Sequence, residues 1–325
     1  MPEDLKIQVG STLDLVIEKL VYGGDGFAHF GSRACFVKSV IPGEKVCAAV
    51  EEIKPQYLIL SPREIITPSP YRIVPSCPIV NDCGGCQWQH ISCDHQLYWK
   101  GLILKECLAR IAGLQEQVIL EPASSPLIFN YRNRATLKVS LSGPPAVGYF
   151  KEKTHDVVPV TSCALLAAPL NNALAVCRQA QESAPDFFRD ISEIEMLFLH
   201  KDSRTMLAFK NKKLKAADKR MLSESAKAFT MHDKGALEMI HDITFRRSTE
   251  SFCQVNHQQN MRMIDIVVKY FSPLSKAKIL DLYCGCGNFS LFLGRQGAEV
   301  TGIESNGFAV EEAQWNAARN SIHTC

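Results

Sequence analysis

The chain has 325 residues, of which 46% are hydrophobic and 22% are charged, a composition typical of a globular protein with two or three domains. The formal net charge is only +2, so a nucleic-acid site has to be a local patch. The first residues hold no apolar signal core, and no run reaches membrane-spanning length. Thirteen cysteines in such a chain indicate a reducing, cytoplasmic compartment, where cysteine clusters bind metals or take part in catalysis more often than they form disulfides.

The first part of the chain, residues 11–68, predicts a small β-barrel. Short apolar segments alternate with turns, among them the glycines at 23–26 and Pro42-Gly43, which gives four or five short strands. Barrels of this size often bind oligonucleotides on one face, although a purely structural role fits the same pattern. Three prolines between positions 68 and 75 then make a stiff exit from the barrel.

Three cysteines lie close together in the segment CPIVNDCGGCQWQH, at Cys77, Cys83 and Cys86. They are separated by five and then two residues, and glycines fill the shorter gap, so the backbone can fold tightly around a bound centre. An iron–sulfur cluster needs four thiolates, often three local and one distant, whereas a zinc ribbon pairs two two-residue spacings. The spacing therefore favours an iron–sulfur cluster, with zinc or buried free thiols as the alternatives.

Residues 69–255 predict a central α+β domain that carries this loop. A helix is expected from Ser92 or Asp94 to about Ile111, with apolar residues at helical spacing on one face for packing and Gly113 as its end.

After a turn at 143–145, the segment 147–163 predicts returning strands. Its last residue, Cys163, is the first candidate for a distant fourth cluster ligand. A helix and a β-hairpin follow. We interpret the basic run NKKLKAADKR at 211–220 as the solvated start of a helix rather than as a nucleic-acid contact.

The clearest strand of this domain is FNYRNRATLKVSL. Its alternation places Arg132, Arg134 and Lys138 on one face and mostly apolar residues on the other. Three positive charges in a row suit a phosphate backbone, which predicts that these three residues contact a nucleic acid. A solvated outer face explains the same pattern, so the sequence leaves both interpretations open.

From position 278 the pattern changes to KILDLYCGCGNFSLFLGRQGAEVTGIESN: a strand, a glycine loop, a helix and a second strand. Glu304 ends the second strand, 19 residues after Gly285, where a carboxylate can accept the hydroxyl groups of a ribose. Ser290 replaces the third glycine of a dinucleotide fingerprint, and Asp281 lies four residues before the first glycine. An acid there can hold the loop and approach a cationic amino-acid group, which favours S-adenosylmethionine over a dinucleotide.

Together these segments resemble the RNA uracil-5 methyltransferases, the enzymes that make 5-methyluridine in ribosomal and transfer RNA. The resemblance runs from residue 11 to about residue 320. It is most specific in CPIVNDCGGCQWQH, YRNRATLKV, VGYFKEKTHDVVPVTSC, ESFCQVNHQQN and LDLYCGCGNFS. The N-terminal segment is similar to the TRAM domain, an RNA-binding barrel, in KLVYGGDGFAHF and CFVKSVIPGEKV.

The resemblance implies a multidomain α/β fold. Its parts are a tail at 1–10, an OB-like TRAM barrel at 11–68, a central α+β iron–sulfur domain at 69–255, and the N-terminal part of a class I, Rossmann-like methyltransferase domain at 256–325. It also implies that the 94–113 helix packs on the methyltransferase part.

The resemblance further implies two cofactors and one partner. A 4Fe-4S cluster is expected on Cys77, Cys83, Cys86 and Cys163. S-adenosylmethionine is expected on Gln254, Tyr283, Asn288 and Glu304. RNA, ribosomal or transfer, is then the expected partner of Arg132, Arg134 and Lys138. We expect a monomeric, cytoplasmic enzyme of the RNA (uracil-5-)-methyltransferase class that does not act at a membrane.

One departure from the family pattern concerns the chemical step. In the family a thiolate adds to C6 of the uracil, C5 takes the methyl group, and a carboxylate removes the C5 proton. The family's D-P-P-R-x-G and S-C-N-P segments, which supply these groups, do not occur in the 325 residues, and Cys284, Cys286 and Cys325 do not match the nucleophile. We therefore expect an incomplete methyltransferase domain, with an unpaired edge on its first strand, and no methylation by these residues alone.

Three functions compete at this point. The first is an RNA uracil-5 methyltransferase that lacks its chemical residues here, and the intact cofactor motif favours it. The second is a catalytically inactive RNA-binding iron–sulfur module, favoured by the missing chemical motifs. A redox protein that uses the cluster is the third, with no further support in the sequence. The downstream coding sequence, read in all frames, discriminates between the first two.

Overall fold

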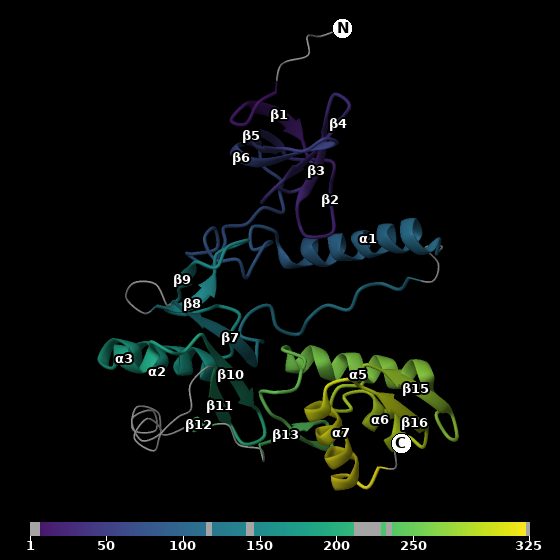
Figure 1. Ribbon diagram of the computed structural model, residues 1–325. Coiled ribbons are helices and arrows are strands. Elements are labelled where there is room, and N and C mark those ends of the chain that lie inside the picture. The colour runs from purple at the N-terminus through teal and green to yellow at the C-terminus, as the bar shows by residue number, and fades with distance from the viewer. Residues whose placement is uncertain (1–6, 115–118, 141–145, 211–228, 232–235, 323–325) are drawn as a thin grey trace. The chain divides into compact units, whose positions relative to one another are not determined.

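The computed structural model describes residues 7–114, 119–140, 146–210, 229–231 and 236–322 (Figure 1). The chain divides into two compact units, Met1–Ser124 and Ser125–Cys325. The predicted turn at 143–145 and the basic run at 211–220 lie outside the described residues. Within the described ranges, no helix combines the length and the apolar character that a membrane span requires.

The first unit is built on a six-stranded sheet. Its strands are β1 (Thr12–Val16), β2 (Lys19–Leu20), β3 (Gly26–Phe30), β4 (Arg33–Val37), β5 (Lys45–Ile53) and β6 (Tyr57–Thr67). They pair in the order β1-β5-β6-β4-β3-β2, and only β4 and β6 run parallel. In β1, Leu13 and Leu15 are buried and their neighbours are exposed, so the alternating sequence supplies one apolar face. The sequence predicts four or five strands here, whereas the described residues form six. The additional strand, β2, has only two residues.

A buried carboxylate fastens the exit from this sheet. The Glu44 side chain has no exposed surface, and its two oxygens accept hydrogen bonds from the Arg72 guanidinium at 2.6 and 2.7 Å. The backbone N–H groups of Ile41 and Ser69 donate to the same carboxylate at 2.8 and 3.0 Å. Burial alone would raise the pKa of Glu44, but these hydrogen bonds outweigh it and hold the pKa below its usual value.

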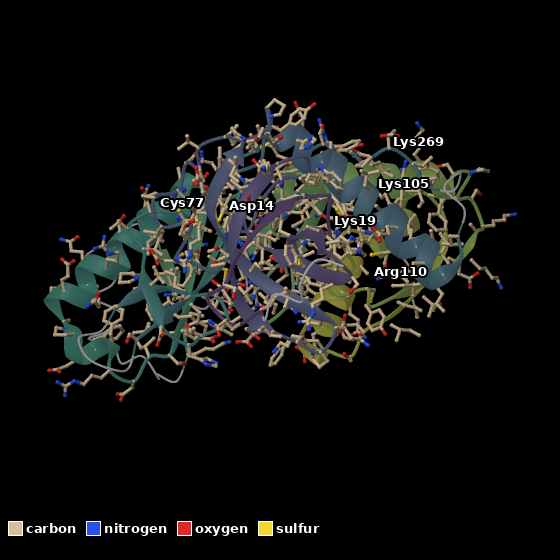
Figure 2. The ribbon with its side chains drawn as sticks, turned by 90° about the horizontal axis from the view of Figure 1, so that it is seen from above. Asp14, Lys19, Cys77, Lys105, Arg110 and Lys269 are labelled. Atoms are coloured by element: carbon tan, nitrogen blue, oxygen red, sulfur yellow. The ribbon has the colours of Figure 1, made fainter. Side chains whose placement is uncertain are left out.

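The cysteine loop and the helix after it pack on the barrel, whereas the sequence assigns residues 69–124 to the central domain. Trp88 donates its indole N–H to the carbonyl of Gly24 at 2.9 Å, and Lys19 forms an ion pair with Glu106 at 2.6 Å (Figure 2 labels Lys19). Gly24 has a φ of +103°, and a side chain there would lie 2.7 Å from the Trp88 indole nitrogen. The buried apolar residues of this contact are Leu20, Ile41 and Ile91.

The helix that follows, α1 (Cys93–Ala112), ends where the sequence predicts. Gly113 has a φ of +63° and donates its backbone N–H to the last turn, a left-handed helix end. Ser92 takes the N-cap position without a side-chain hydrogen bond. Leu104 and Ile111, on the face predicted to pack, are 50% and 77% exposed. Packing of this face on the methyltransferase part stays a prediction.

The second unit begins with another six-stranded sheet. Its strands are β7 (Arg134–Val139), β8 (Val147–Phe150), β9 (Val157–Pro159), β10 (Glu193–Leu199), β11 (Arg204–Phe209) and β12 (Phe229–Met231). They pair in the order β12-β11-β10-β7-β8-β9. Two helices, α2 (Ala168–Ser183) and α3 (Pro185–Phe188), accompany them. The predicted alternation of β7, the returning strands β8 and β9 and the β10–β11 hairpin are confirmed.

The last part of the second unit contains the cofactor motif. Its elements are β13 (Leu237–Ile240), β14 (Ile243–Arg246), α5 (His257–Phe271), β15 (Lys278–Leu282), α6 (Ser290–Arg295), β16 (Glu299–Ile303) and α7 (Gly307–Arg319). β15 and β16 are parallel, in the predicted order of strand, loop, helix and strand. Among the described residues their sheet has two strands, and Leu280, Leu282 and Ile303 on it are more than half exposed.

The Glu44 carboxylate gives a stability prediction. Glu44→Gln removes the charge opposite Arg72 in a buried site, and we expect a loss of about 3 kcal/mol in the free energy of unfolding at pH 7. Because the folded pKa is lowered, this stabilisation is present above the unfolded pKa and disappears as pH falls below about 4. The measurement is urea unfolding of both proteins at several pH values.

The matched control is Glu52→Gln, which changes an exposed partner of Lys54 on β5. We expect less than about 0.5 kcal/mol for it, since surface ion pairs contribute little. Equal losses for the two variants would contradict the role assigned to Glu44.

Candidate functional site

The glycine loop between β15 and α6 has a left-handed backbone at three positions. Tyr283, Gly285 and Gly287 have φ angles of +61°, +56° and +90°. A side chain at Gly287 would lie 3.0 Å from Leu291 Cγ, so both conformation and space require glycine there. Tyr283 adopts this conformation without being glycine, and its side chain is 88% exposed. The loop therefore leaves the sheet in a sharp turn that other contacts have to hold.

The carboxylate of Glu304, directly after β16, supplies the first of these contacts. One oxygen accepts the backbone N–H of Gly285 at 3.0 Å. The other accepts the N–H groups of Ser305 and Asn306, each at 2.8 Å. The N–H of Asn306 and then the other donors lower the pKa of Glu304, so this carboxylate is ionised at neutral pH. It joins the ends of both strands at the loop.

A second contact explains the serine that replaces the third glycine. Ser290 is buried at the start of α6 and donates its hydroxyl to the carboxylate of Asp281 at 2.6 Å. Asp281, on β15, thus holds the end of the loop, as the sequence predicts. A glycine at position 290 could not make this bond.

A pair of asparagines connects the loop to α5. Asn260 and Asn288 each donate an amide N–H to the other's carbonyl oxygen, at 2.9 and 2.8 Å. Asn260 is only 3% exposed. We did not expect a role for this residue from the sequence. The available signal was a polar residue on the same helix face as the buried Ile264, four positions away.

Gln254 lies just before α5 and lines a cavity of about 10 Å³ together with Asn260. This cavity has room for about one water molecule. Asn260 thus lines a cavity with Gln254 and also bonds Asn288. Glu304 is bonded to the same loop, whereas the Tyr283 side chain extends into solvent. The assignment of these four residues to S-adenosylmethionine stays a prediction.

A buried arginine also contacts the glycine loop. Arg247 is 3% exposed, and its guanidinium donates to the thiol of Cys286 within the glycine loop. Burial raises the pKa of Cys286 more than Arg247 lowers it, and burial, with Asp281 and Glu304 nearby, raises the pKa of Cys284. Thiolates are the reactive form of cysteine, so neither thiol is activated as a nucleophile. This agrees with leaving that role unassigned.

The three clustered cysteines lie in consecutive turns of the first unit and are half-buried (Figure 2 labels Cys77). The N–H of Cys77 donates to the Gln89 side chain at 3.1 Å, and that of Cys83 donates to the Ile79 carbonyl at 2.9 Å. The assignment of Cys77, Cys83 and Cys86 to a cluster stays a prediction.

Cys163, the predicted fourth ligand, belongs to the second unit. Asn171 holds its backbone from both sides: the Asn171 oxygen accepts the Cys163 N–H at 2.9 Å, and its amide donates to the Cys163 carbonyl at 3.0 Å. The thiol is half-buried and free. Its place in a cluster stays a prediction.

The basic face predicted on β7 is largely neutralised within the protein. Arg134 donates to the carbonyl groups of Thr249, at 2.5 Å, and of Ser251, and to Glu195 at 3.2 Å. Lys138 pairs with Glu193, and the hydrogen bond from Lys138 is the main reason why the pKa of Glu193 is lowered.

The third member of that face, Arg132, uses its Nε to donate to the Arg134 carbonyl at 3.0 Å. Glu193 and Glu195 on the neighbouring strand β10 thus compensate the charges of Lys138 and Arg134, whereas Arg132 donates to a carbonyl. Whether the three residues also contact RNA stays a prediction.

Two family models match the chain. The TRAM domain matches residues 6–59, and the tRNA (Uracil-5-)-methyltransferase model matches residues 220–325.

Curated relatives match nearly the whole chain. The 23S rRNA (uracil(1939)-C(5))-methyltransferase RlmD of Dichelobacter nodosus is 30% identical over 320 residues, which cover 93% of this chain and 74% of that protein. An uncharacterized RNA methyltransferase of Thermosynechococcus vestitus is 27% identical over 348 residues, 97% of this chain and 78% of that protein.

A solved structure is similar over the same extent. It is the Pyrococcus abyssi tRNA (uracil-54, C5)-methyltransferase in complex with S-adenosyl-L-homocysteine, with a TM-score of 0.72 and 22% identity. The match covers 95% of this chain and 77% of that one, which shows a shared fold.

The parallel β15–α6–β16 unit, with its glycine loop and the carboxylate after the second strand, defines a class I methyltransferase domain that follows an N-terminal TRAM domain. The relatives make the family specific. The chain belongs to the RNA uracil-5 methyltransferases.

The pairing of Arg134 gives the second prediction. Arg134→Met keeps the length of the side chain but removes all three hydrogen bonds, and we expect the free energy of unfolding of the second unit to fall by about 2–3 kcal/mol. The measurement is urea unfolding, with Arg189→Met as the control, because Arg189 forms an exposed pair with Asp186. A variant of unchanged stability whose RNA binding loses about one unit of salt dependence would instead support the RNA contact.

Proposed function

We propose that this protein is an S-adenosylmethionine-dependent RNA methyltransferase that makes 5-methyluridine in ribosomal or transfer RNA. The observation that carries the proposal is the glycine loop with its anchor: Gly285 bonded to the carboxylate of Glu304, at the carboxyl ends of two parallel strands. Cofactors of open α/β sheets bind at this edge. The methylation reaction at this site is inferred from membership of the family.

The residues of the site divide the binding task among them. Bound S-adenosylmethionine supplies an electrophilic methyl group. One oxygen of the ionised Glu304 accepts two backbone N–H groups and the Ser305 hydroxyl, whereas the other accepts only the Gly285 N–H and has a lone pair left for a ribose hydroxyl. The carboxylate of Asp281, fixed by Ser290, places negative charge near the loop for a cationic amino-acid group. Asn288 is held by Asn260, so its orientation is set before the ligand binds.

Methylation of C5 also needs a nucleophile at C6 and a base for the C5 proton. Cys284 and Cys286 are poor candidates, because burial raises the pKa of both thiols. In the family, the nucleophile and the base come from segments that these 325 residues do not contain. That these residues alone do not transfer the methyl group therefore stays a prediction.

The proposed RNA class follows the relatives. The Dichelobacter nodosus protein is named for a uridine of 23S rRNA, and the Pyrococcus abyssi structure for a uridine of tRNA. The first is the more similar in sequence, so ribosomal RNA is tested first. A monomeric enzyme in a reducing cytoplasm fits thirteen cysteines kept as thiols or cluster ligands.

The function is tested by nucleoside analysis of RNA after incubation with S-adenosylmethionine. Unmodified 23S rRNA and tRNA are treated with the 325-residue chain, alone and fused to the downstream segment of a relative. We expect 5-methyluridine only with the fusion and in one of the two RNAs. A fusion that binds S-adenosyl-L-homocysteine but methylates neither RNA would refute the proposed function. Formation of 5-methyluridine by the 325 residues alone would instead refute the prediction that they lack the nucleophile.

We further propose that Cys77, Cys83, Cys86 and Cys163 hold a 4Fe-4S cluster. Three local thiols and one distant thiol are the number and type of ligand that such a cluster needs. All four cysteines are half-buried, so their thiols are neither locked in the core nor fully in solvent. The side-chain oxygens of Gln89 and Asn171 accept the backbone N–H groups of Cys77 and Cys163 and so fix two of the four cysteines.

The cluster has its own test. Protein purified without oxygen should contain iron and sulfide at about four each per chain, with a broad visible absorption band. Cys163→Ser should lose both, whereas Cys93→Ser, at the start of α1, should keep them. Stoichiometric zinc without sulfide would rule the cluster out, and loss in Cys93→Ser alone would reassign the fourth ligand.

A further inference from the structure

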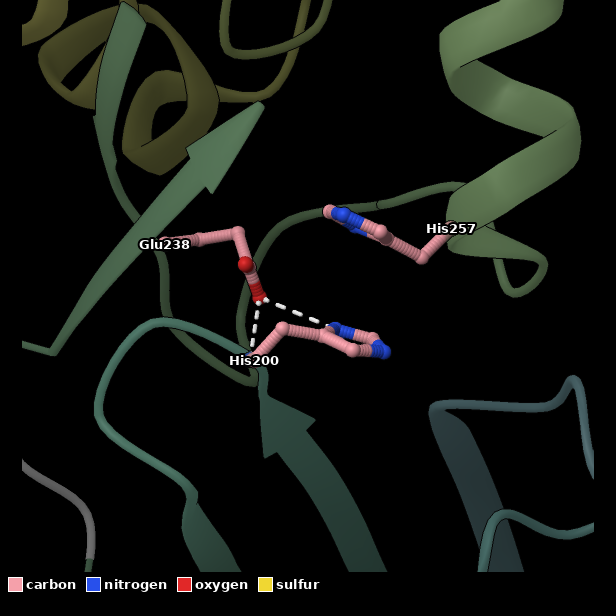
Figure 3. A group of neighbouring side chains, drawn as sticks. All are labelled: His200, Glu238 and His257. Carbon is pink, nitrogen blue, oxygen red and sulfur yellow. Dashed lines mark hydrogen bonds and ion pairs between the residues drawn. The ribbon is translucent and has the colours of Figure 1, made fainter. Parts of the chain in front are cut away.

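Two histidines and a buried glutamate converge beside the cavity that Gln254 lines. His200 directly follows β10, Glu238 lies on β13, and His257 begins α5 (Figure 3). In the described part of the chain this is the one group of three His, Cys, Asp or Glu side chains whose ligand atoms all lie within 4.8 Å of one another. Segments far apart in sequence therefore meet at these three side chains.

The distances fit one small metal ion. Nitrogen and oxygen ligands at about 2.1 Å from a tetrahedral zinc ion lie about 3.4 Å apart. His200 Nδ1 is 3.6 Å from Glu238 Oε2, and the two imidazole rings have centroids 4.1 Å apart. Figure 3 shows the His257 ring extending from the helix toward the other two side chains. The two rings are stacked with 22° between their planes, so binding of one ion requires rotation of the imidazoles about their side-chain bonds.

The pKa shifts of His257 and Glu238 favour the ionisation states that metal ligands need. Burial lowers the pKa of His257, and the neighbouring His200 lowers it further, so its imidazole is neutral at pH 7. Burial would raise the pKa of Glu238, but hydrogen bonds from the His200 side chain and backbone outweigh it and leave a carboxylate. The backbone N–H groups of His200 and Met239, each at 3.1 Å, hold that carboxylate in place.

The charge balance also leaves room for a cation. Arg247 lines the same cavity, and its guanidinium faces two buried carboxylates, Glu238 and Glu312. With the His257 imidazole neutral, the one guanidinium stands against two carboxylates. A bound dication or a proton on a histidine compensates the remaining negative charge.

We propose that His200, Glu238 and His257 bind a divalent transition metal, with zinc as the best fit. Two imidazoles and one carboxylate are a known zinc ligand set that leaves a fourth position for water. The His200 side chain is 37% exposed, so solvent reaches that position. The metal would connect the β10 turn, β13 and α5 one helical turn from Asn260, which holds the cofactor loop.

The test uses Co²⁺ as a spectroscopic substitute for Zn²⁺ on chelator-treated protein. We expect one equivalent bound with visible bands of nitrogen and oxygen ligation and without a sulfur charge-transfer band, which separates this site from the cysteines. His257→Ala and Glu238→Gln should each weaken Co²⁺ binding by more than about 10-fold. Glu238→Gln keeps the shape of the side chain and one of its two acceptor oxygens, so the test reports on ligation once the fold of the variant has been checked.

The control is His241→Ala, because His241 pairs with Asp265 at 3.1 Å outside the group and should leave Co²⁺ affinity unchanged. Circular dichroism checks that each variant is folded. Sulfur-ligated Co²⁺ only, no Co²⁺ binding, or equal binding in the wild type and Glu238→Gln would each overturn the proposal. The last two results would assign the trio to a hydrogen-bonded contact with a protonated histidine.

Discussion

The arrangement of the candidate site depends on one carboxylate, that of Glu304. The glycine loop turns through three left-handed residues, one of which, Tyr283, carries a side chain. A left-handed conformation costs a residue with a side chain about 1–2 kcal/mol. Hydrogen bonds to an ionised group contribute about 1.5–3 kcal/mol where solvent is excluded and less where it is not. Glu304 accepts three such bonds from backbone N–H groups and a longer one from the Ser305 hydroxyl, so it offsets the strain and joins the loop to β16.

Other contacts of the loop add to the hydrogen bonds that Glu304 makes with it. Ser290 and Asp281 close its far end, and the Asn260–Asn288 pair connects it to α5. Arg247, directly after β14, donates a hydrogen bond to the thiol of Cys286 in the loop. The loop is thus held from a strand, a helix and a hairpin that are separate in sequence, which is how a pocket can be organised before its ligand arrives.

Local patterns predicted the local structure well. The alternation in β1 and β7, the end of α1 at Gly113 and the strand–loop–helix–strand order around Gly285 all follow from the spacing of apolar residues and glycines. These features depend on neighbours within a few residues, which a sequence displays directly.

Features that depend on distant partners were not predictable. Lys138 and Arg134 appeared as free charges because Glu193 and Glu195 lie 55 and 61 residues away. The placement of residues 69–124 on the barrel depends on Trp88 reaching Gly24. His200, Glu238 and His257 come from three elements, and none of the three stands out in its own segment.

The most direct test of the central claim is the affinity of the protein for S-adenosyl-L-homocysteine, measured by isothermal titration calorimetry. If Glu304 both holds the loop and binds the ribose, Glu304→Gln should weaken binding by about 10- to 100-fold, the equivalent of the hydrogen bonds to a charged group that are lost. Glu299→Gln, the same change at an exposed position at the start of the same strand, should bind as the wild type does. Equal affinity of the two folded variants would contradict this account of the site.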